Sequence, residues 1–250
     1  MIVWITGASS GLGRVVARRY AEAGHIVCAT ARSEEQLAEL AEECRNAPGK
    51  VMVFGVDVTD PSAVADCFLD IRKAAGVPDL TILNAGAHSP NSVKFFDREI
   101  FKRLMNVNYM GTINCLQAIV PACLDLGKGH IAVVSSVAGY RGLPNASAYG
   151  ASKAALINLC EALQPELRMR GVKLTVINPG FVRTPMTDKN EFPMPFLMDV
   201  EKAAERMVSE LEKDKFEITF PRRFTWLLKL LRILPINIYL WLTARLIKHD

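Results

Sequence analysis

The 250-residue chain lacks the features that place a protein outside the ordinary globular class. It has no internal repeat, no low-complexity linker and no strong charge excess, since its net charge is +4 with 50% hydrophobic and 22% charged residues. This balance excludes a disordered, collagen-like or coiled-coil chain and permits a large buried core. Because no boundary interrupts residues 1–220, we expect one domain there.

The sequence also lacks a cysteine pattern that would bind a metal or build a disulfide framework. No CxxC pair and no Cys/His cluster is present, and the cysteines are scattered, mostly within apolar segments. The six are Cys28, Cys44, Cys67, Cys115, Cys123 and Cys160. We expect buried, reduced thiols, a cytoplasmic location and no metal.

Signals for secretion or membrane spanning are missing as well. The N-terminus enters an apolar run without the basic region and long apolar stretch of a signal peptide. Near the C-terminus, Lys229, Arg232 and Pro235 interrupt every window of about 20 apolar residues, the length that a span requires. No transmembrane helix is therefore expected.

Positive charge gathers in residues 221–250. Six basic residues against Asp250 give this segment a net charge of +5, which leaves −1 for residues 1–220. Nucleic-acid binding by the whole chain therefore finds no support. The segment is rich in Trp, Leu and basic residues, and we expect a C-terminal extension of two short amphipathic helices. Three roles stay open: peripheral contact with an anionic membrane, a cover over a substrate pocket, or burial against a second subunit.

Short β-branched runs alternate with segments of helical period along residues 1–220. The expected strands are 2–5, 26–29, 51–56, 80–83, 131–134, 173–177 and 217–220. Helix signals lie between them: Ser33 with a capping-box spacing to Gln36, Asp60-Pro61, and an apolar stripe from Val200 to Leu211. The pattern predicts an α/β fold, a doubly wound Rossmann-type sheet of seven parallel strands with helices on both faces.

The first predicted strand leads into a glycine-rich turn, Thr6-Gly7-Ala8-Ser9-Ser10-Gly11-Leu12-Gly13, followed by an amphipathic helix. Glycines let a backbone approach a pyrophosphate closely, and the free N–H groups at a helix start favour its charge. A tight turn without a ligand would use the same residues. The spacing differs from the commoner Gly-x-Gly-x-x-Gly and indicates one branch of dinucleotide binders.

The end of the second predicted strand bears on the choice of dinucleotide. NAD-binding folds place a carboxylate there to accept the ribose 2′-hydroxyl, whereas an arginine suits a 2′-phosphate. This chain has Arg32, and its carboxylates come only at Glu34 and Glu35, inside the next helix. Arg32 favours NADP, with NAD as the alternative because Ser10 supplies no second positive charge. A solvated loop arginine is the other interpretation.

Tyr149 and Lys153 lie four residues apart at the start of a long helical segment and so share one helix face. An ammonium beside the phenol would lower the tyrosine pKa from about 10 and provide an acid or base near neutral pH. An exposed helical pair would show the same spacing.

Taken together, these motifs match one family. The run Thr6-Gly7-x-x-x-Gly11-x-Gly13, Asn84-Ala85-Gly86, Asn108, Ser136, Tyr149-x-x-x-Lys153 and Pro179-Gly180 has the order and approximate spacing of the short-chain dehydrogenase/reductases. The chain resembles the compact, single-domain branch of that family over about residues 1–220.

The resemblance implies a catalytic set of Asn108, Ser136, Tyr149 and Lys153. Tyr149 would protonate a carbonyl oxygen as hydride arrives, Ser136 would hydrogen-bond the same oxygen, and Lys153 would hold the nicotinamide ribose. Asn108 resembles the asparagine that interrupts its helix and anchors a relay water, an assignment for which Asn106 is the rival. Asparagine is a poor interior helix residue, which agrees with such a role.

The resemblance also implies the residues that hold the dinucleotide. Asp57 and Val58 would flank the adenine, although Asp57 is equally suited to cap a loop, and Val182 and Thr184 would lie beside the carboxamide. The full implied set is Gly7, Ser9, Ser10, Gly11, Leu12, Arg32, Asp57, Val58, Asn84, Ala85, Gly86, Tyr149, Lys153, Pro179, Gly180, Val182 and Thr184.

Substrate and partners are less constrained. The family places a variable substrate loop after Thr184, and residues 185–200 are apolar here. The side chains concerned are Phe192, Met194, Phe196, Leu197 and Met198. They suit a hydrophobic ketone, aldehyde or secondary alcohol, or they pack on the chain's own extension. His88 is interpreted as incidental.

Two further expectations concern assembly and activity. The family implies a homodimer or homotetramer, commonly paired through the helices that contain Asn108 and Tyr149. A rival to the oxidoreductase is a redox sensor or scaffold that binds the dinucleotide without turnover and reaches a membrane or partner through its basic extension. The intact catalytic set favours the enzyme.

Overall fold

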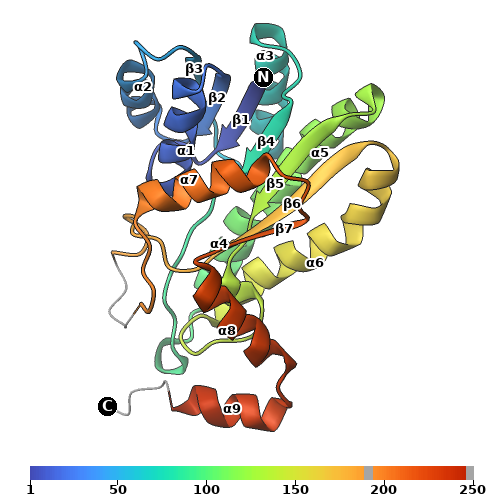
Figure 1. The fold of residues 1–250 in the computed structure, drawn as a ribbon. Helices are drawn as coiled ribbons and strands as arrows, with labels where there is room; N and C mark the ends of the chain where they lie inside the picture. Colours follow the sequence, from blue (N-terminus) through green and yellow to red (C-terminus); the bar gives the residue numbers. More distant parts are fainter. Residues whose placement is uncertain (189–193, 246–250) are drawn as a thin grey trace.

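The computed structural model describes residues 1–188 and 194–245. Its centre is one sheet in which all neighbouring strands are parallel, in the order β3-β2-β1-β4-β5-β6-β7 (Figure 1). The strands are β1 (Ile2–Thr6), β2 (Ile26–Ala31), β3 (Lys50–Gly55), β4 (Leu80–Leu83), β5 (Gly129–Val134), β6 (Val172–Pro179) and β7 (Glu217–Phe220). The predicted doubly wound α/β sheet is confirmed.

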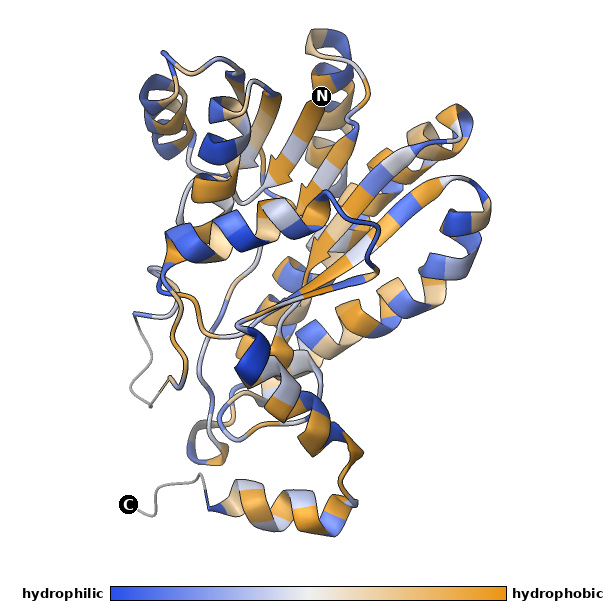
Figure 2. Ribbon diagram, in the orientation of Figure 1, coloured by the Kyte–Doolittle hydropathy of each residue, from blue (hydrophilic) through white to orange (hydrophobic). Residues whose placement is uncertain are grey.

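Helices cover both faces of the sheet. Those of the main body are α1 (Gly11–Glu22), α2 (Glu34–Glu43), α3 (Pro61–Ala74), α4 (Arg98–Leu104), α5 (Gly111–Leu126), α6 (Ser147–Met169) and α7 (Val200–Leu211). Alternation along β1 shows the two layers, since Val3 and Ile5 pack with α1, α2 and α7, whereas Trp4 packs with α3, α5 and α6. Buried strands lined on both faces by helices explain the continuous apolar runs in the sequence (Figure 2).

The predicted helix starts are confirmed by their caps. The Ser33 hydroxyl accepts a hydrogen bond from the Gln36 N–H, and the Asp60 carboxylate accepts from the N–H groups of Ser62 and Ala63, with Pro61 as the first helical residue. Both caps satisfy donors that the first helical turn leaves free. They fix the turns that follow β2 and β3.

The order of the strands positions the site. After β1 the chain adds β2 and β3 on one side of that strand and then places β4 on its other side. The strand order therefore reverses between β1 and β4, which are adjacent in the sheet. A crevice opens outside the carboxyl ends of the strands at such a point. The glycine-rich turn follows β1 and Asn84 follows β4, which brings these motifs to the same edge.

Two C-terminal helices, α8 (Arg222–Ile233) and α9 (Ile236–Ala244), follow β7 and lie beyond the carboxyl edge of the sheet (Figure 1). The expectation of two short helices is confirmed, but α9 is not amphipathic. It contains no charged residue, and it buries Tyr239 and Thr243 while Ile236 and Trp241 remain exposed. The Tyr239 hydroxyl donates to the Gly142 carbonyl of the body and the Thr243 hydroxyl to the Tyr239 carbonyl, whereas Asn237 is exposed.

All six cysteines are buried free thiols, as the sequence analysis predicted. Burial raises the pKa of Cys28 to about 11 and that of Cys115 to about 12, which keeps both protonated. Among the described residues, no group of His, Cys, Asp or Glu side chains is arranged to hold a metal ion. None of the described helices combines the length and hydropathy that a membrane crossing needs.

Candidate active site

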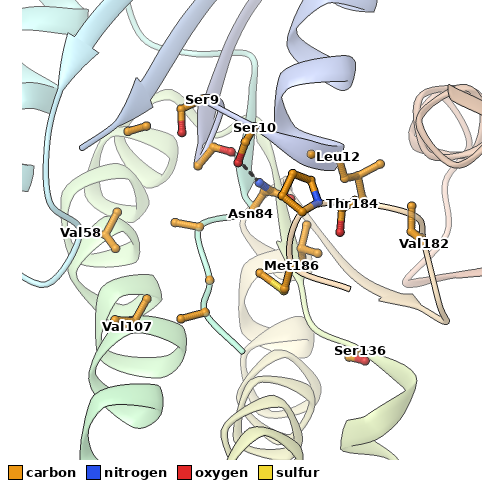
Figure 3. A pocket seen from close by; sticks show the side chains of 18 of the residues that line it. Ser9, Ser10, Leu12, Val58, Asn84, Val107, Ser136, Val182, Thr184 and Met186 are labelled. Carbon is orange, nitrogen blue, oxygen red and sulfur yellow. Dashed lines mark hydrogen bonds between the residues drawn. The ribbon is translucent and has the colours of Figure 1, made fainter. Parts of the chain in front are cut away.

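A cavity of about 540 Å³ opens at the carboxyl edge between β1 and β4. Every implied cofactor-binding residue lines it, from Gly7 in the glycine-rich turn to Thr184 after β6. In Figure 3, Ser9, Ser10 and Leu12 border one end and Ser136 the other, with Val58 and Val107 opposite Val182 and Thr184. The cavity therefore joins the phosphate-binding motif to the predicted catalytic residues.

The glycine-rich turn fits a dinucleotide because its backbone is packed too closely for side chains. Gly7 has φ +68°, and a Cβ there would lie 2.8 Å from the Ala85 Cα. A Cβ on Gly13 would lie 2.4 Å from both the Gly7 carbonyl oxygen and the Asn84 Nδ2. Asn84 holds the turn by donating to the carbonyls of Thr6 and Gly7.

The turn presents the start of α1 to the cavity. Ser10 is the N-cap residue in extended conformation, and its hydroxyl forms no capping hydrogen bond. The first-turn N–H groups of a helix have no partner within it, and the helix dipole favours an anion at this end. With Ser9 and Ser10 lining the cavity, the donors suit a pyrophosphate.

The end of β2 contributes a cation to the cavity but no carboxylate. Arg32, Ser33 and Gln36 line this part of the wall, and Arg32 is exposed. The side chain of Glu34 lies against Gly55, where a Cβ would be 2.2 Å from its Oε1. The neighbouring carboxylate, Asp57, lines the cavity and also accepts from the N–H and hydroxyl of Thr59. The loop-cap interpretation of Asp57 is therefore confirmed, and its contact with an adenine stays a prediction.

One end of the cavity brings together three of the predicted catalytic residues, Ser136, Tyr149 and Lys153. Ser136 follows β5, accepts from the Ala138 N–H at 3.1 Å and forms a hydrogen bond with Tyr149. The neighbouring Ser135 instead donates to the Lys153 carbonyl at 2.7 Å. The choice of Ser136 over Ser135 as the site serine agrees with this geometry.

The environment of Tyr149 and Lys153 corrects one sequence-based expectation. Burial raises the pKa of Tyr149, against a hydrogen bond from Ser136 that lowers it, so the phenol stays protonated. Lys153 donates from Nζ to the Val134 carbonyl at 2.9 Å, and Nζ lies 5.8 Å from the Tyr149 ring centroid. Loss of solvent lowers the pKa of Lys153 to about 8. The Tyr149 pKa is therefore shifted upward and not downward as expected, because the effect of burial exceeds that of the Ser136 hydrogen bond.

Asn108 is fully buried behind the cavity wall, in a π-helical segment (Met105–Met110) between α4 and α5. Its Oδ1 accepts from the Ala87 N–H at 2.7 Å, while its Nδ2 donates to the Ala87 carbonyl and the Ser152 hydroxyl. The side chain thus braces the segment after β4 against α6. Asn106 is exposed, so Asn108 is the asparagine at the site. The implied relay water stays a prediction.

His88, which was interpreted as incidental from the sequence, does not line the cavity but contacts a residue that does. Its ring meets the ring of Tyr149 edge-on, with centroids 4.7 Å apart and planes at 84°. Burial lowers the pKa of His88, so the imidazole is neutral near pH 7. A lone histidine gives no signal in a sequence, although its position four residues after Asn84 placed it at the correct edge.

Some cavity-lining residues escaped the sequence analysis. They are Ala31, Ser33, Gln36, Val56, Ala87, Arg103, Val107, Val134, Ser135, Pro185, Met186 and Thr187. Thr187 has a clear local role, since its hydroxyl donates to the Val182 carbonyl and accepts from the Thr184 N–H. This contact holds the wall segment after β6 in place.

The apolar residues of segment 185–200 are divided between roles. Met186 lines the cavity, whereas the ring of Phe196 lies 6.0 Å from that of Phe224 in α8. For Phe196 the alternative of packing on the C-terminal extension is therefore the one observed. Phe192 lies outside the described residues.

Comparisons with known proteins agree with this geometry. The family model for short chain dehydrogenases matches residues 1–193. A protein of Myxococcus xanthus named an uncharacterized oxidoreductase is 37% identical over 231 residues, which are 92% of this chain and 91% of that protein.

Solved structures show the same fold. A short-chain dehydrogenase from Sphingobium yanoikuyae in complex with NADPH is 27% identical, with a TM-score of 0.80 over 88% of this chain and 87% of its own. One from Burkholderia phymatum in complex with NAD is 24% identical and shares the fold, with a TM-score of 0.84 over 92% of each chain. The chain belongs to the short-chain dehydrogenase/reductase family of oxidoreductases, which act on CH–OH and C=O groups.

Proposed function

We propose that the protein transfers hydride between NADP(H) and a hydrophobic ketone or aldehyde, or the matching secondary alcohol. The observation that carries the proposal is the protonated Tyr149 hydroxyl beside Ser136 at one end of a cavity whose other end is a phosphate-binding turn. Bound NADPH supplies the hydride; the protein's own groups position the carbonyl and handle the proton.

The state of each catalytic side chain suits reduction of a carbonyl. Tyr149 is held neutral by burial, so it has a proton to give to a carbonyl oxygen that is gaining charge. Ser136 donates a second hydrogen bond to the same oxygen. Lys153, with a pKa of about 8, is mostly cationic at pH 7 and lies on the cavity side of α6, where it would hold the ribose hydroxyls.

NADP is supported over NAD by the charges at the end of β2. Arg32 lines the cavity there, while the carboxylate of Glu34 is turned toward Gly55. A 2′-phosphate would meet a guanidinium, whereas a 2′-hydroxyl would find no carboxylate from this turn. The solved structures hold NADPH in one case and NAD in the other, so the preference for NADP is inferred from Arg32.

The hydrophobic substrate is supported by the wall of the cavity near Ser136. Val182 and Met186 contribute apolar side chains to the cavity, and the neighbouring Phe181 packs against Phe224 with ring centroids 5.6 Å apart. Apolar walls with a few placed polar groups are typical of sites for small hydrophobic ligands.

The central test is the Tyr149→Phe variant, assayed by NADPH oxidation over aliphatic, aromatic, steroid and acyl-thioester carbonyls. The change removes only the hydroxyl and keeps the ring that His88 contacts. We expect kcat to fall at least about a hundredfold, the usual contribution of a general acid, with NADPH affinity retained. Tyr109→Phe, in the same fold but packed against the core, is the matched control. Unchanged turnover in Tyr149→Phe would refute the mechanism.

Cofactor choice is tested by Arg32→Ala. Loss of a charge-assisted contact should weaken NADPH binding by roughly 10- to 100-fold and leave NADH nearly unchanged. Arg45→Ala serves as the control, because Arg45 is an exposed arginine paired with Glu42 beyond the other end of α2. An equal loss for both dinucleotides would remove the case for NADP.

A further inference from the structure

Helices α8 and α9 expose an unusual density of large apolar side chains, which we term the tail face. Its members are Trp226, Leu227, Leu230, Ile233, Ile236, Ile238, Leu240 and Trp241. Trp226 is 75% exposed and Ile233 79% exposed, although both lie on well-formed helices. Both helices show strong hydrophobic colour in Figure 2. Scattered single exposed apolar residues are ordinary, but eight large ones on two consecutive short helices indicate an interaction site.

The charged residues of the segment that carries the tail face are all basic. Residues 221–245 contain five basic residues and no acidic one. Arg222 and Lys229 pair with the body carboxylates Glu210 and Glu217. Among the described residues, no ion pair involves Arg223, and Arg245 lies over the Trp241 ring at 3.6 Å. The uncompensated charge therefore points to an anionic partner.

Charge also argues against a second copy as the occupant. In a two-fold contact the same patch meets itself, so the tail face would bring its basic residues against the identical set. Neither helix offers a carboxylate to offset that repulsion. The surface of an anionic phospholipid bilayer matches both the apolar side chains and the positive charge of the tail face, because it combines an apolar interior with negative headgroups.

The dimensions fit a helix pair that lies in the bilayer interface. Nine residues give α9 a length of about 13 Å, well below the thickness of the hydrocarbon core. Two tryptophans on the exposed side suit the headgroup region, where an apolar ring with a polar N–H is favoured.

The tail face is fixed relative to the cavity. Phe224 in the first turn of α8 packs against Phe181, and its Cδ1 would lie 2.9 Å from a Cβ on the cavity residue Gly180. Figure 1 shows α8, α9 and the segment between β4 and α4 together at the carboxyl end of the sheet. That segment exposes Val93 and Phe96, 91% and 70%, at the same end.

We propose that α8 and α9 bind the surface of an anionic phospholipid bilayer and that the cavity takes its carbonyl substrate from that bilayer. The first part stands on the tail face alone. The second part rests on the proposed function and assigns the substrate to the class of hydrophobic carbonyl compounds that partition into lipid.

The binding test is sedimentation of the full chain with vesicles of phosphatidylcholine containing phosphatidylglycerol, and with vesicles of phosphatidylcholine alone. We expect binding to the anionic vesicles that weakens as salt is added. Trp226→Glu combined with Trp241→Glu should reduce affinity at least about tenfold, because apolar burial is replaced by negative charge. Arg223→Ala should reduce it about fivefold, the usual effect of one basic residue near such a surface.

Matched controls separate surface chemistry from general damage. Leu69→Glu places the same charge on α3, at a side chain that is 48% exposed, and Lys128→Ala removes a cation from the turn before β5. Both should bind vesicles like the wild type. All variants should keep wild-type turnover of a water-soluble carbonyl, since none changes a cavity residue.

The substrate part is tested by NADPH oxidation with a long-chain ketone dissolved in the anionic vesicles. The wild type should turn it over at least about tenfold faster than the double tryptophan variant, in step with the loss of vesicle affinity.

Several results would overturn the proposal. Failure of the wild type to sediment, or equal binding by the tryptophan variant, removes the membrane contact. A wild-type dimer that Trp226→Glu dissociates, without vesicle binding, makes the tail face an interface between copies. Vesicle binding with equal ketone turnover by both proteins overturns the substrate assignment. Failure of the proposed function is distinguishable, since it would show as turnover that does not depend on Tyr149.

Discussion

Arg141 anchors the C-terminal helices to the segment between Ser136 and Tyr149, two of the proposed catalytic residues. It lies five residues after Ser136, and its guanidinium donates to the carbonyls of Leu231 at 2.7 Å and Leu234 at 2.9 Å. Leu231 and Leu234 lie at the end of α8, where the Leu231 carbonyl also accepts from the Leu234 N–H at 3.4 Å. Arg141 adds a charged donor to this helix end, whose last carbonyls lack the full set of helical partners. The same guanidinium lies over the Tyr239 ring at 4.0 Å, and the Tyr239 hydroxyl donates to the Gly142 carbonyl.

The free energy by which Arg141 stabilises the docked α9 can be estimated from its individual interactions. A hydrogen bond from a charged donor contributes about 1.5–3 kcal/mol when its partners are shielded, and a cation–π contact about 1 kcal/mol. Because Arg141 is only partly buried and the contacts share one side chain, we take about 3 kcal/mol for the set. Arg141→Leu should therefore raise the undocked population of α9 roughly 150-fold, since 1.4 kcal/mol corresponds to a factor of ten.

Native-state hydrogen exchange measures this population directly. The amides of α9 should exchange roughly 150-fold faster in Arg141→Leu, while those of β1 and β4 keep their wild-type rates. Arg72→Leu is the control, because Arg72 is an exposed arginine whose guanidinium lies 5.9 Å from the Phe68 ring centroid. Unchanged exchange in α9 would refute the anchoring role. Equal acceleration in α9 and β1 would show that α9 does not open separately from the sheet.

Two further predictions concern the cavity. Gly13→Ala should lower the free energy of unfolding by about 2 kcal/mol in urea titrations and weaken NADPH binding, because its Cβ would meet the Gly7 carbonyl at 2.4 Å. Gly142→Ala is the control and should do neither, because a Cβ there would have no atom within 4 Å. Equal effects of the two substitutions would contradict the close packing at Gly13. Lys153→Met tests the buried cation: the wild-type lysine has a pKa of about 8 when folded and about 10.4 when unfolded, so the unfolded state binds more protons between these values. Wild-type stability relative to Lys153→Met should therefore rise by about 3 kcal/mol from pH 8 to pH 10.5, and parallel pH curves would show that burial does not perturb this lysine.

Much of the fold could be predicted because the sheet is buried on both faces. All seven predicted strands are present, since a parallel strand between helices must be apolar throughout. The errors lie at the ends. The run predicted for β6 stopped at Ile177, whereas the strand continues to Pro179 because Asn178 and Pro179 pair with Thr219 and Phe220 of β7. A partner strand in the sheet decides such ends, and local composition does not report it.

The site could be predicted where a motif has a fixed spacing. Tyr149 and Lys153 are one helical turn apart, so their common face follows from the sequence. The contact of His88 with Tyr149 joins two segments that are distant in the chain, and no local pattern encodes it. The same holds for Glu217, whose carboxylate accepts from Tyr140, Asn178 and Lys229. Burial raises the pKa of Glu217, but these three hydrogen bonds outweigh it and hold that pKa below its usual range.

Glu217 also connects the C-terminal extension to the main body of the fold. Its carboxylate joins β7 to Tyr140, which lies four residues after the proposed catalytic residue Ser136, and to Lys229 of α8. Arg141 makes the second connection from the same loop to α8, and Phe224 belongs to the main hydrophobic core. One side of α8 is thus tied to the loop between Ser136 and Tyr149, while its other side exposes Trp226 and Leu230. A partner bound to that outer side would act on a helix in direct contact with the loop between Ser136 and Tyr149.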